Sequence, residues 1–183
     1  QHVGRVGGET PLHLACKLSD SRILRFLVKR SSVDPQKANL EGDTPLIVAV
    51  KQRKPHQVAA LLLSRKTDVN YSADGGAPVI FSAIEARSDQ ILRLLLKNPK
   101  TDVNAFGPMG QEPLFTAANK GYTNAVKLLL RREDINIESR CVLLQDRSAL
   151  LIAHLNDAHN IVNMIAKSSK FEIFIQDLIK RNK

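Results

Sequence analysis

The chain has 183 residues, of which 43% are hydrophobic and 4% aromatic, and its formal net charge is +9. No apolar run reaches the roughly 18 to 20 residues that a membrane-spanning helix needs, and two cysteines are too few for a disulfide framework. These features argue against a membrane-spanning or disulfide-rich secreted protein, and they favour a cytoplasmic or a nuclear location.

The first element along the chain is the stretch Gly8 to Cys16, with the sequence GETPLHLAC. Thr before Pro favours a helix start, because the Thr side chain can cap free N–H groups and Pro has no N–H to satisfy. Weaker copies of Thr10-Pro11-Leu12 follow at spacings of 34, 33, 35 and 36 residues: Thr44-Pro45-Leu46, Ala77-Pro78-Val79, Glu112-Pro113-Leu114 and Ser148-Ala149-Leu150. A period in this range indicates a stacked repeat array.

A second apolar run follows each copy after a short polar loop. The five runs are Ile23 to Val28, Val58 to Leu63, Ile91 to Leu96, Val126 to Leu130 and Ile161 to Ile165. Apolar residues three and four positions apart predict amphipathic helices. Each unit is therefore predicted to be a pair of short antiparallel helices.

These segments resemble the ankyrin repeat, in which a turn Gly is followed by Thr-Pro-Leu-His-x-Ala, a second helix and Asp-Val-Asn. The ending is matched by Asp68-Val69-Asn70, Asp102-Val103-Asn104 and Asp134-Ile135-Asn136, and the turn Gly by Gly8, Gly42, Gly75 and Gly110. The resemblance extends over roughly residues 4–168. It implies an all-α solenoid of stacked helix-turn-helix units with β-turn or hairpin tips.

The predicted organisation is a repeat array over 1–168 followed by a C-terminal capping helix over 169–183. The five repeats are expected at about 5–38, 39–72, 73–107, 108–144 and 145–168. In the last helix one apolar face carries Phe171, Phe174, Ile175, Leu178 and Ile179. This face either closes the stack or awaits a partner or a further repeat. The chain opens without Met, so we expect a fragment of a larger intracellular protein.

Several repeats are predicted to depart from the pattern, and the first and last are expected to be atypical. The first has Ser19-Asp20-Ser21 where the family usually has Gly, so Ser or Asp is expected to cap its second helix. The fifth has Asp146 in place of the turn Gly and Ala149 in place of Pro. The third has Ala77 in place of Thr, and Ser82 at the position of the packing Ala. The loops between the two helices of the second and third repeats, at 51–54 and 86–89, are predicted to be one residue longer than the others.

No residue pattern predicts catalysis, a metal or a cofactor. The histidines are not spaced as metal ligands, and the chain has no phosphate-binding glycine loop. Of the five histidines only His13 occupies the motif position, where the resemblance implies hydrogen bonds within and between repeat turns. We therefore predict that the chain is not an enzyme.

The resemblance implies a partner-binding concave face, made by the turn tips and the exposed ends of the first helices. Four apolar positions on it, Leu18, Leu40, Ile84 and Met109, are expected to form a groove with a basic rim. The candidate binding residues are Lys17, Leu18, Leu40, Glu41, Asp43, Lys51, Gln52, Arg53, Asp74, Ile84, Glu85, Arg87, Met109, Gln111, Asn119, Lys120, Tyr122 and Arg147.

The predicted function is a monomeric protein-interaction module that binds an acidic or amphipathic protein segment on its concave face. One alternative is a binder of anionic surfaces, either nucleic acid or acidic lipid. Many cations lie at helix ends, where they complement the helix dipole, and there is no aromatic stacking platform, so this alternative is disfavoured. A third reading is the targeting domain of an enzyme whose catalytic part lies outside this sequence.

Overall fold

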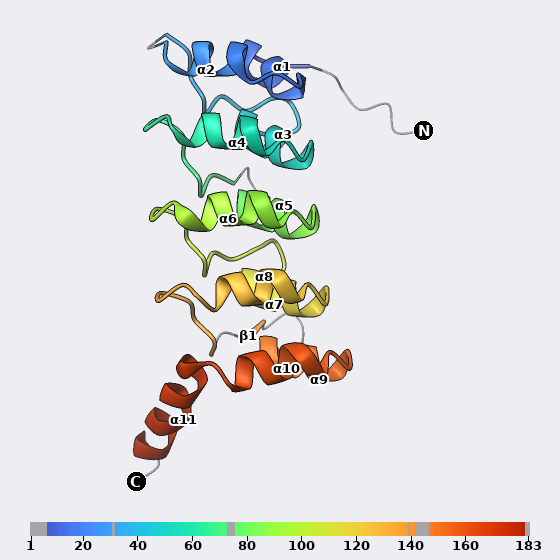
Figure 1. Ribbon diagram of the computed structural model, residues 1–183, viewed down its shortest axis with the longest axis vertical. Coiled ribbons are helices and arrows are strands. Elements are labelled where there is room, and N and C mark those ends of the chain that lie inside the picture. Colours follow the sequence, from blue (N-terminus) through green and yellow to red (C-terminus); the bar gives the residue numbers. More distant parts are fainter. Residues whose placement is uncertain (1–6, 31, 73–75, 139, 142–146, 182–183) are drawn as a thin grey trace. The chain divides into compact units, whose positions relative to one another are not determined.

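The computed structural model describes residues 7–30, 32–72, 76–138, 140–141 and 147–181 (Figure 1). The chain divides into two compact units, Gln1–Thr101 and Asp102–Lys183. Within the described residues every long element is a helix, as predicted.

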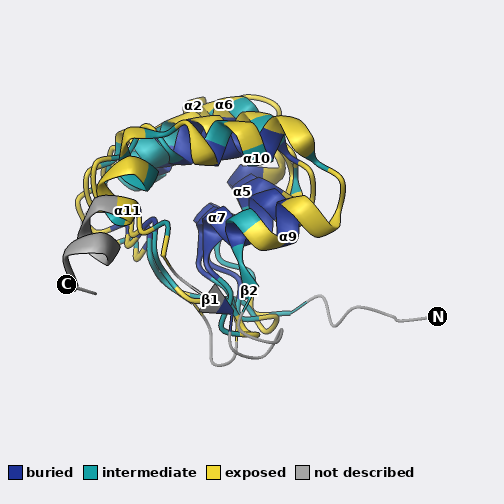
Figure 2. Cartoon of the chain, turned by 90° about the horizontal axis from the view of Figure 1, so that it is seen from below, coloured by how far each residue is buried: buried dark blue, intermediate teal, exposed yellow. Residues whose placement is uncertain are grey.

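The first unit contains three helix pairs. Its helices are α1 (Pro11–Lys17), α2 (Arg22–Val28), α3 (Pro45–Lys51), α4 (Pro55–Leu62), α5 (Val79–Glu85) and α6 (Asp89–Lys97). The first helices of the pairs, α1, α3 and α5, pack in a row, and α2, α4 and α6 form a second row against them. We call these rows the inner and outer helices. In Figure 2 the inner helix α5 is mostly buried, whereas α2 and α6 expose one side.

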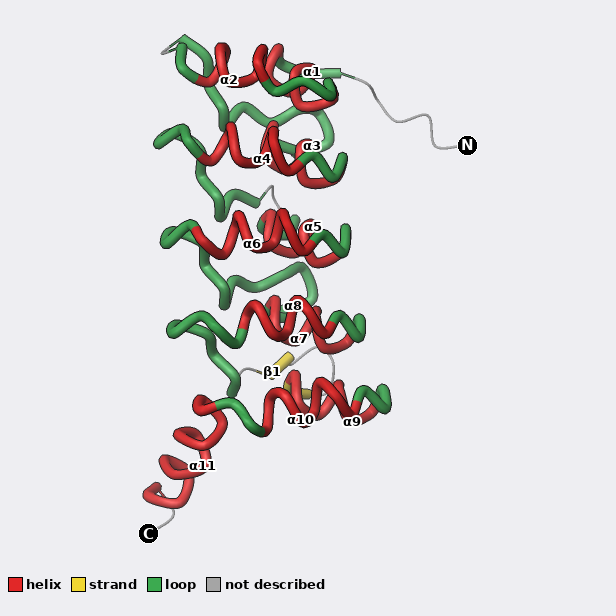
Figure 3. Tube along the Cα trace, in the orientation of Figure 1, coloured by secondary structure: helices red, strands yellow, loops and turns green. Residues whose placement is uncertain are grey.

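The described part of the second unit contains two helix pairs, a two-stranded hairpin and a final helix. Its elements are α7 (Pro113–Asn119), α8 (Thr123–Leu129), β1 (Arg140–Cys141), β2 (Arg147–Ser148), α9 (Ala149–Leu155), α10 (His159–Ala166) and α11 (Ser169–Arg181). The inner helices α7 and α9 pack together, as do the outer helices α8 and α10. Figure 3 shows β1 in the loop that follows α8.

The inner helices start at Pro11, Pro45, Val79, Pro113 and Ala149, so their spacings are 34, 34, 34 and 36 residues. The sequence alignment of the third repeat was one residue out of register, because Pro78 is the residue before α5 and not its first residue. Pro at this position leaves the helix start intact, since Pro contributes no N–H there.

The correct register places a buried Ala at the fifth position of every inner helix. These residues are Ala15, Ala49, Ala83, Ala117 and Ala153. The prediction that Ser82 replaces the packing Ala is therefore wrong, because Ala83 fills that position and is 0% exposed. A small side chain lets neighbouring helices approach closely in a tightly packed core.

The predicted loop lengths are also wrong. In the second to fifth repeats three residues separate the inner from the outer helix, and the first repeat has four. The middle loop residue has a positive φ in those four repeats: Arg53, Arg87, Gly121 and Asp157. Only glycine adopts this conformation without strain, so Arg53 and Arg87 are each held at a local cost.

In the first repeat none of the four loop residues between α1 and α2 has a positive φ, and the Asp20 side chain bonds to the start of α2 instead. The backbone N–H of Arg22 donates to Asp20 Oδ1 at 2.9 Å, and its guanidinium pairs with Asp20 Oδ2 at 2.6 Å. The N-cap residue Ser21 makes no side-chain capping bond, so Asp20, one residue earlier, satisfies the first N–H of α2.

Hairpin-like turns form the described tips, as predicted. In the first unit Asn39 N donates to Asp43 O at 2.9 Å, and Gly42 has φ 79°. In the second unit β1 pairs with β2 in antiparallel fashion, with Cys141 opposite Arg147. The expected turn residues Asp74 and Gly75 lie outside the described residues.

The final helix α11 contacts α10, and Lys170 Nζ donates to the carbonyl oxygen of Glu133. Phe171 and Phe174 are half-buried, with ring centroids 6.0 Å apart, whereas Ile173 is 58% exposed. The side chains of Leu178 and Ile179 lie outside the description. The capping role of this helix and the predicted repeat boundaries remain predictions.

Candidate interaction surfaces

The first candidate surface lies in the first unit, where the turn tips meet the inner helices. We call it the inner face. A pocket of about 150 Å³ opens on it, lined by Gly7, Glu9, Lys17, Asn39, Glu41, Asp43, Val48, Lys51 and Gln52. A second pocket of about 270 Å³ shares Glu41, Asp43 and Lys51 with the first and reaches Gly76 and Ser82. The inner face is therefore hollowed between the first and second repeats and between the second and third.

Two ion pairs line the inner face. Lys17 Nζ lies 2.5 Å from Glu9 Oε1, and Lys51 Nζ lies 2.6 Å from Asp43 Oδ2. The acid precedes the base by eight residues in both cases, so the tip of a repeat is tied to the end of its own inner helix. Lys17 and Lys51, two lysines of the expected basic rim, are thus each matched by a carboxylate. Together with Glu41, the rim of the first pocket holds three acids and two bases.

Two apolar side chains next in sequence to residues of the first pocket are exposed, as predicted. Leu18 is 44% exposed and Leu40 is 68% exposed. Leu40 rests against the tip of the preceding repeat, where its backbone N–H donates to Gly7 O at 3.2 Å. A Cβ on Gly7 would stand 2.6 Å from Leu40 Cδ1, so glycine at this point lets the two tips approach.

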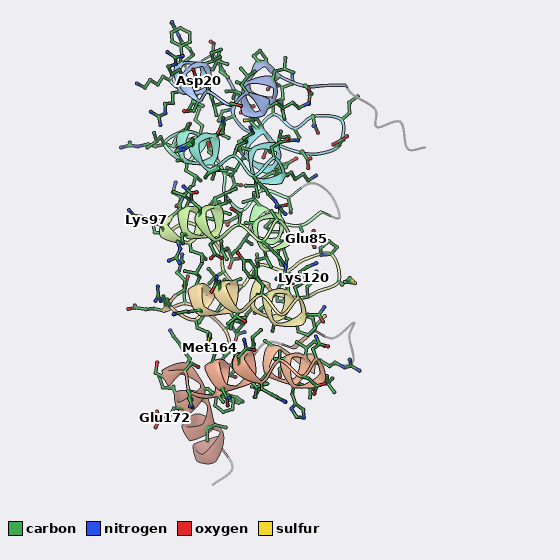
Figure 4. All side chains as sticks on the ribbon, turned by 45° about the vertical axis from the view of Figure 1, so that its right-hand side comes forward. Asp20, Glu85, Lys97, Lys120, Met164 and Glu172 are labelled. Atoms are coloured by element: carbon green, nitrogen blue, oxygen red, sulfur yellow. The ribbon has the colours of Figure 1, made fainter. Side chains whose placement is uncertain are left out.

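Most of the other candidates of the first unit are exposed. Glu41, Gln52 and Arg53 are exposed, as are Glu85 and Arg87 at the third bend; Figure 4 labels Glu85 at the end of α5.

Ile84 is 0% exposed, so its expected place on the surface is wrong. The shifted register explains the error, because Ile84 corresponds to the buried Val50 and not to Lys51. Asp74 lies outside the described residues.

In the second unit Met109 is 51% exposed at the turn tip. Its backbone N–H donates to Gln111 Oε1 at 2.9 Å, so the half-buried Gln111 shapes the turn. Asn119 and Lys120 are exposed, and Asn156 Nδ2 donates to Asn119 O at 3.1 Å.

Two further candidates of the second unit are less accessible than expected. Tyr122 is only 7% exposed, which corrects its expected place on the surface. It is the residue before α8 and is part of the buried core. Arg147, in β2, is half-buried.

His13 makes the contacts that the resemblance implied. The backbone N–H of Thr10 donates to His13 Nδ1 at 3.0 Å, and His13 Nε2 lies 2.9 Å from the carbonyl oxygen of Asp43. An accepting Nδ1 places the ring proton on Nε2, which donates to Asp43. This ring therefore links one repeat to the next and is not placed to act as a metal ligand.

Asparagines in the repeat tails provide similar links. Asn70 Nδ2 donates to Lys100 O at 2.7 Å, and Asn104 Nδ2 donates to Asp134 O at 2.6 Å. Asn104 also accepts a hydrogen bond on Oδ1 from the backbone N–H of Asn136 at 2.8 Å. These amides satisfy backbone groups of the following repeat.

The shifted pKa values have structural causes. Hydrogen bonds from the backbone and the side chain of Arg22 lower the pKa of Asp20. A hydrogen bond with Arg132 lowers the pKa of Asp134, and the same bond raises the pKa of Arg132. Burial raises the pKa of the Cys16 thiol from 9.0 to about 12. Cys16 is thus protonated at neutral pH and is no nucleophile, because the thiolate is the reactive form.

Within the described residues, no group of His, Cys, Asp or Glu side chains is arranged to hold a metal ion. None of the described helices has the length and hydropathy to cross a bilayer.

Comparisons with known proteins agree with the geometry. A family model described as ankyrin repeats (3 copies) matches residues 2–73 and 80–177. Among solved structures, the ankyrin repeat domain of Bcl-3, described as a unique member of the IkappaB protein family, is similar with a TM-score of 0.80 and 25% sequence identity. That similarity covers 88% of this chain and 71% of the Bcl-3 chain. A search of curated proteins found no match.

Proposed function

Because this chain belongs to the ankyrin repeat family, whose domains are general protein-interaction modules, we propose that it binds an amphipathic segment of a partner protein on the inner face. The observation that carries the proposal is the exposure of Leu18 and Leu40, which are the sequence neighbours of residues that line the pocket with the two ion pairs: Leu18 follows Lys17, and Leu40 stands between Asn39 and Glu41. Protein interfaces combine an apolar centre with a polar rim, and exposed leucines near paired charges fit that arrangement.

The two ion pairs determine which kind of partner segment the inner face can bind. Glu9 and Asp43 already balance Lys17 and Lys51, so a strongly acidic segment gains little attraction there. A segment that presents apolar side chains to Leu18 and Leu40, and hydrogen-bonding groups to the ion pairs, fits the surface better. Preformed pairs also hold the lysine side chains in place, which lowers the entropy lost on binding.

The test uses the complete chain as bait for chemical crosslinking and mass spectrometry in a cell lysate. The double variant Leu18→Ser/Leu40→Ser removes the exposed apolar contacts. We expect it to lose a set of crosslinked proteins that the unsubstituted chain captures, and we expect the crosslinks of that set to map to the inner face.

The matched control is Ile23→Ser/Ile173→Ser, because these isoleucines are 53% and 58% exposed and neither lines an inner-face pocket. Circular dichroism checks that both variants keep their helices. An identical set of captured proteins for all three chains would contradict binding on the inner face.

A further inference from the structure

A second hollowed surface lies in the first unit, on the outer helices. One pocket of about 580 Å³ opens between the C-terminal ends of α2 and α4, and another of about 410 Å³ opens between α4 and α6. Leu63 lines both pockets and is 78% exposed. We call the two adjoining pockets the outer groove. Figure 4 labels Lys97 at this edge of the helix pair and Glu85 at the opposite edge.

The lining of the outer groove is strongly basic. The first pocket is bordered by Arg25, Lys29, Arg30, Arg65 and Lys66, and the second by Lys97. No acidic side chain lines either pocket among the described residues. The inner face, by comparison, carries three acids and two bases in its first pocket. Like charges gathered around a hollow raise the local potential and attract anionic groups.

The floor of the outer groove is apolar. Val28, Ala60 and Leu63 line the first pocket, and Leu62, Leu94 and Pro99 line the second. Volumes of this size fall within the range of ligand-binding clefts. Such a floor gains free energy only from an apolar group that fills it.

The rim adds a third feature. Phe26 is 58% exposed, and the guanidinium of Arg30 lies over its ring at 4.4 Å. This contact holds Arg30 at the rim by a cation–π interaction. An anionic side chain can therefore reach Arg30 without first ordering it.

These features together point to one kind of occupant. Nucleic acid offers phosphates but has no aliphatic side chain for the floor. We propose that the outer groove docks an acidic amphipathic segment of a partner protein. Its carboxylates pair with the rim cations, and two of its large apolar side chains enter the two pockets.

The spacing of the pockets suits a helical segment. Packed helices lie about 8 to 10 Å apart, so grooves on either side of α4 recur at about that distance. Two residues seven positions apart on a helix are about 10 Å apart and lie on nearly the same side. The docked segment therefore presents its apolar anchors two turns apart, with acidic residues beside them.

The test measures fluorescence anisotropy with the complete chain and a labelled synthetic probe. The probe is an amphipathic peptide of about 18 residues, with Leu seven positions apart and Glu on the flanks. A second peptide replaces every Glu by Gln. We expect saturable binding of the acidic peptide that weakens as salt is added, and binding of the neutral peptide that is at least about tenfold weaker.

Variants then locate the binding site. Lys29→Glu/Arg65→Glu reverses two exposed rim charges, and we expect the affinity to fall about tenfold or more. Leu63→Asp places a charge at the point that both pockets share and should have a similar effect. The matched control is Lys37→Glu/Lys127→Glu, which makes the same change in net charge at exposed positions outside the outer groove.

Several outcomes would overturn the proposal. One is the absence of saturable binding by the acidic peptide up to about 1 mM. Another is an equal or larger loss in the control variant, which would place the binding elsewhere. A third is tighter binding to duplex DNA or to phosphatidylserine vesicles, with the same dependence on Lys29 and Arg65. Circular dichroism and thermal melting establish that each variant is folded.

Discussion

At the scale of the residue, His13 joins the first two repeats through both nitrogens of a fully buried ring. Nδ1 accepts from Thr10, and Nε2 donates to the carbonyl oxygen of Asp43. Asp43 also pairs with Lys51. A single imidazole therefore orders a turn whose side chains belong to the inner face.

We predict that His13→Ala lowers the free energy of unfolding by about 3 kcal/mol, because it leaves a cavity and removes the partners of the half-buried Thr10 N–H and the buried Asp43 carbonyl. Urea denaturation measures the effect. The adjacent Leu14 is 54% exposed, so Leu14→Ala should cost below about 1 kcal/mol. Equal losses in the two variants would show that the His13 contacts contribute no net stability.

Burial of Cys16 makes the free energy of unfolding depend on pH in the alkaline range. The pKa of its thiol is about 12 in the folded chain and 9.0 without burial, so the folded state disfavours the thiolate. The contribution of the buried thiol is fully present below pH 9 and is lost as the pH rises toward 12.

We predict that the stability advantage of the unsubstituted chain over Cys16→Ala shrinks between about pH 8 and pH 11. Urea denaturation of both chains at each pH provides the measurement. Other titrating groups are common to both chains, so their effects cancel in the difference. A constant difference across this range would mean that the Cys16 thiol is not desolvated.

At the scale of the element, the helix pairs and their order were predictable, because apolar periodicity and Pro mark most helix starts. The register of the third pair was not. The other prolines of the motif are the first residue of their helices, and Pro78 was placed there by analogy. In the structure α5 begins one residue later, at Val79. The recurrence of Ala at the fifth position of all inner helices carried the correct register in the sequence.

Part of the candidate site was also predictable, namely its exposed apolar residues, whereas its ion pairs were not. Leu18, Leu40 and Met109 are exposed as expected, because a turn tip or helix end places them outside the core. The ion pairs on the inner face were missed, although the spacing of Glu9 to Lys17 recurs in the second repeat. The spacing alone does not show that the acid at the tip reaches the lysine at the end of the inner helix, because several other charges lie near both ends.

The register of α5 can be tested with a pair of neighbouring substitutions. We predict that Ala83→Val costs about 1 to 3 kcal/mol, because two added methyl groups have no space at a position that is 0% exposed. Ser82→Val adds a similar branched side chain at a half-buried position and should cost about 1 kcal/mol or less. Thermal or urea unfolding compares the two, and a greater loss from Ser82→Val would restore the rejected alignment.

At the scale of the whole molecule, the stability of a repeat array is approximately the sum of the repeats and their nearest-neighbour contacts. The two compact units, Gln1–Thr101 and Asp102–Lys183, each contain their own rows of inner and outer helices. Damage to the core of one unit is therefore expected to open that unit before the other.

Leu129, at the end of α8, is 0% exposed and offers a direct test. We predict that Leu129→Asp destabilises the second unit by roughly several kcal/mol, because the carboxylate is buried without a partner. Amide hydrogen exchange read by mass spectrometry should show lost protection from α7 to α10 and retained protection from α1 to α6.

The control for this prediction is Lys127→Asp, which places the same carboxylate on the exposed side of α8 and should leave exchange nearly unchanged. The reciprocal variant Leu95→Asp buries a charge in α6, where Leu95 is also 0% exposed, and should open the first unit instead. Since hydrogen exchange reports each segment separately, local and global opening are distinguished directly. Loss of protection along the entire chain in both buried-charge variants would mean that the five repeats unfold as one cooperative structure.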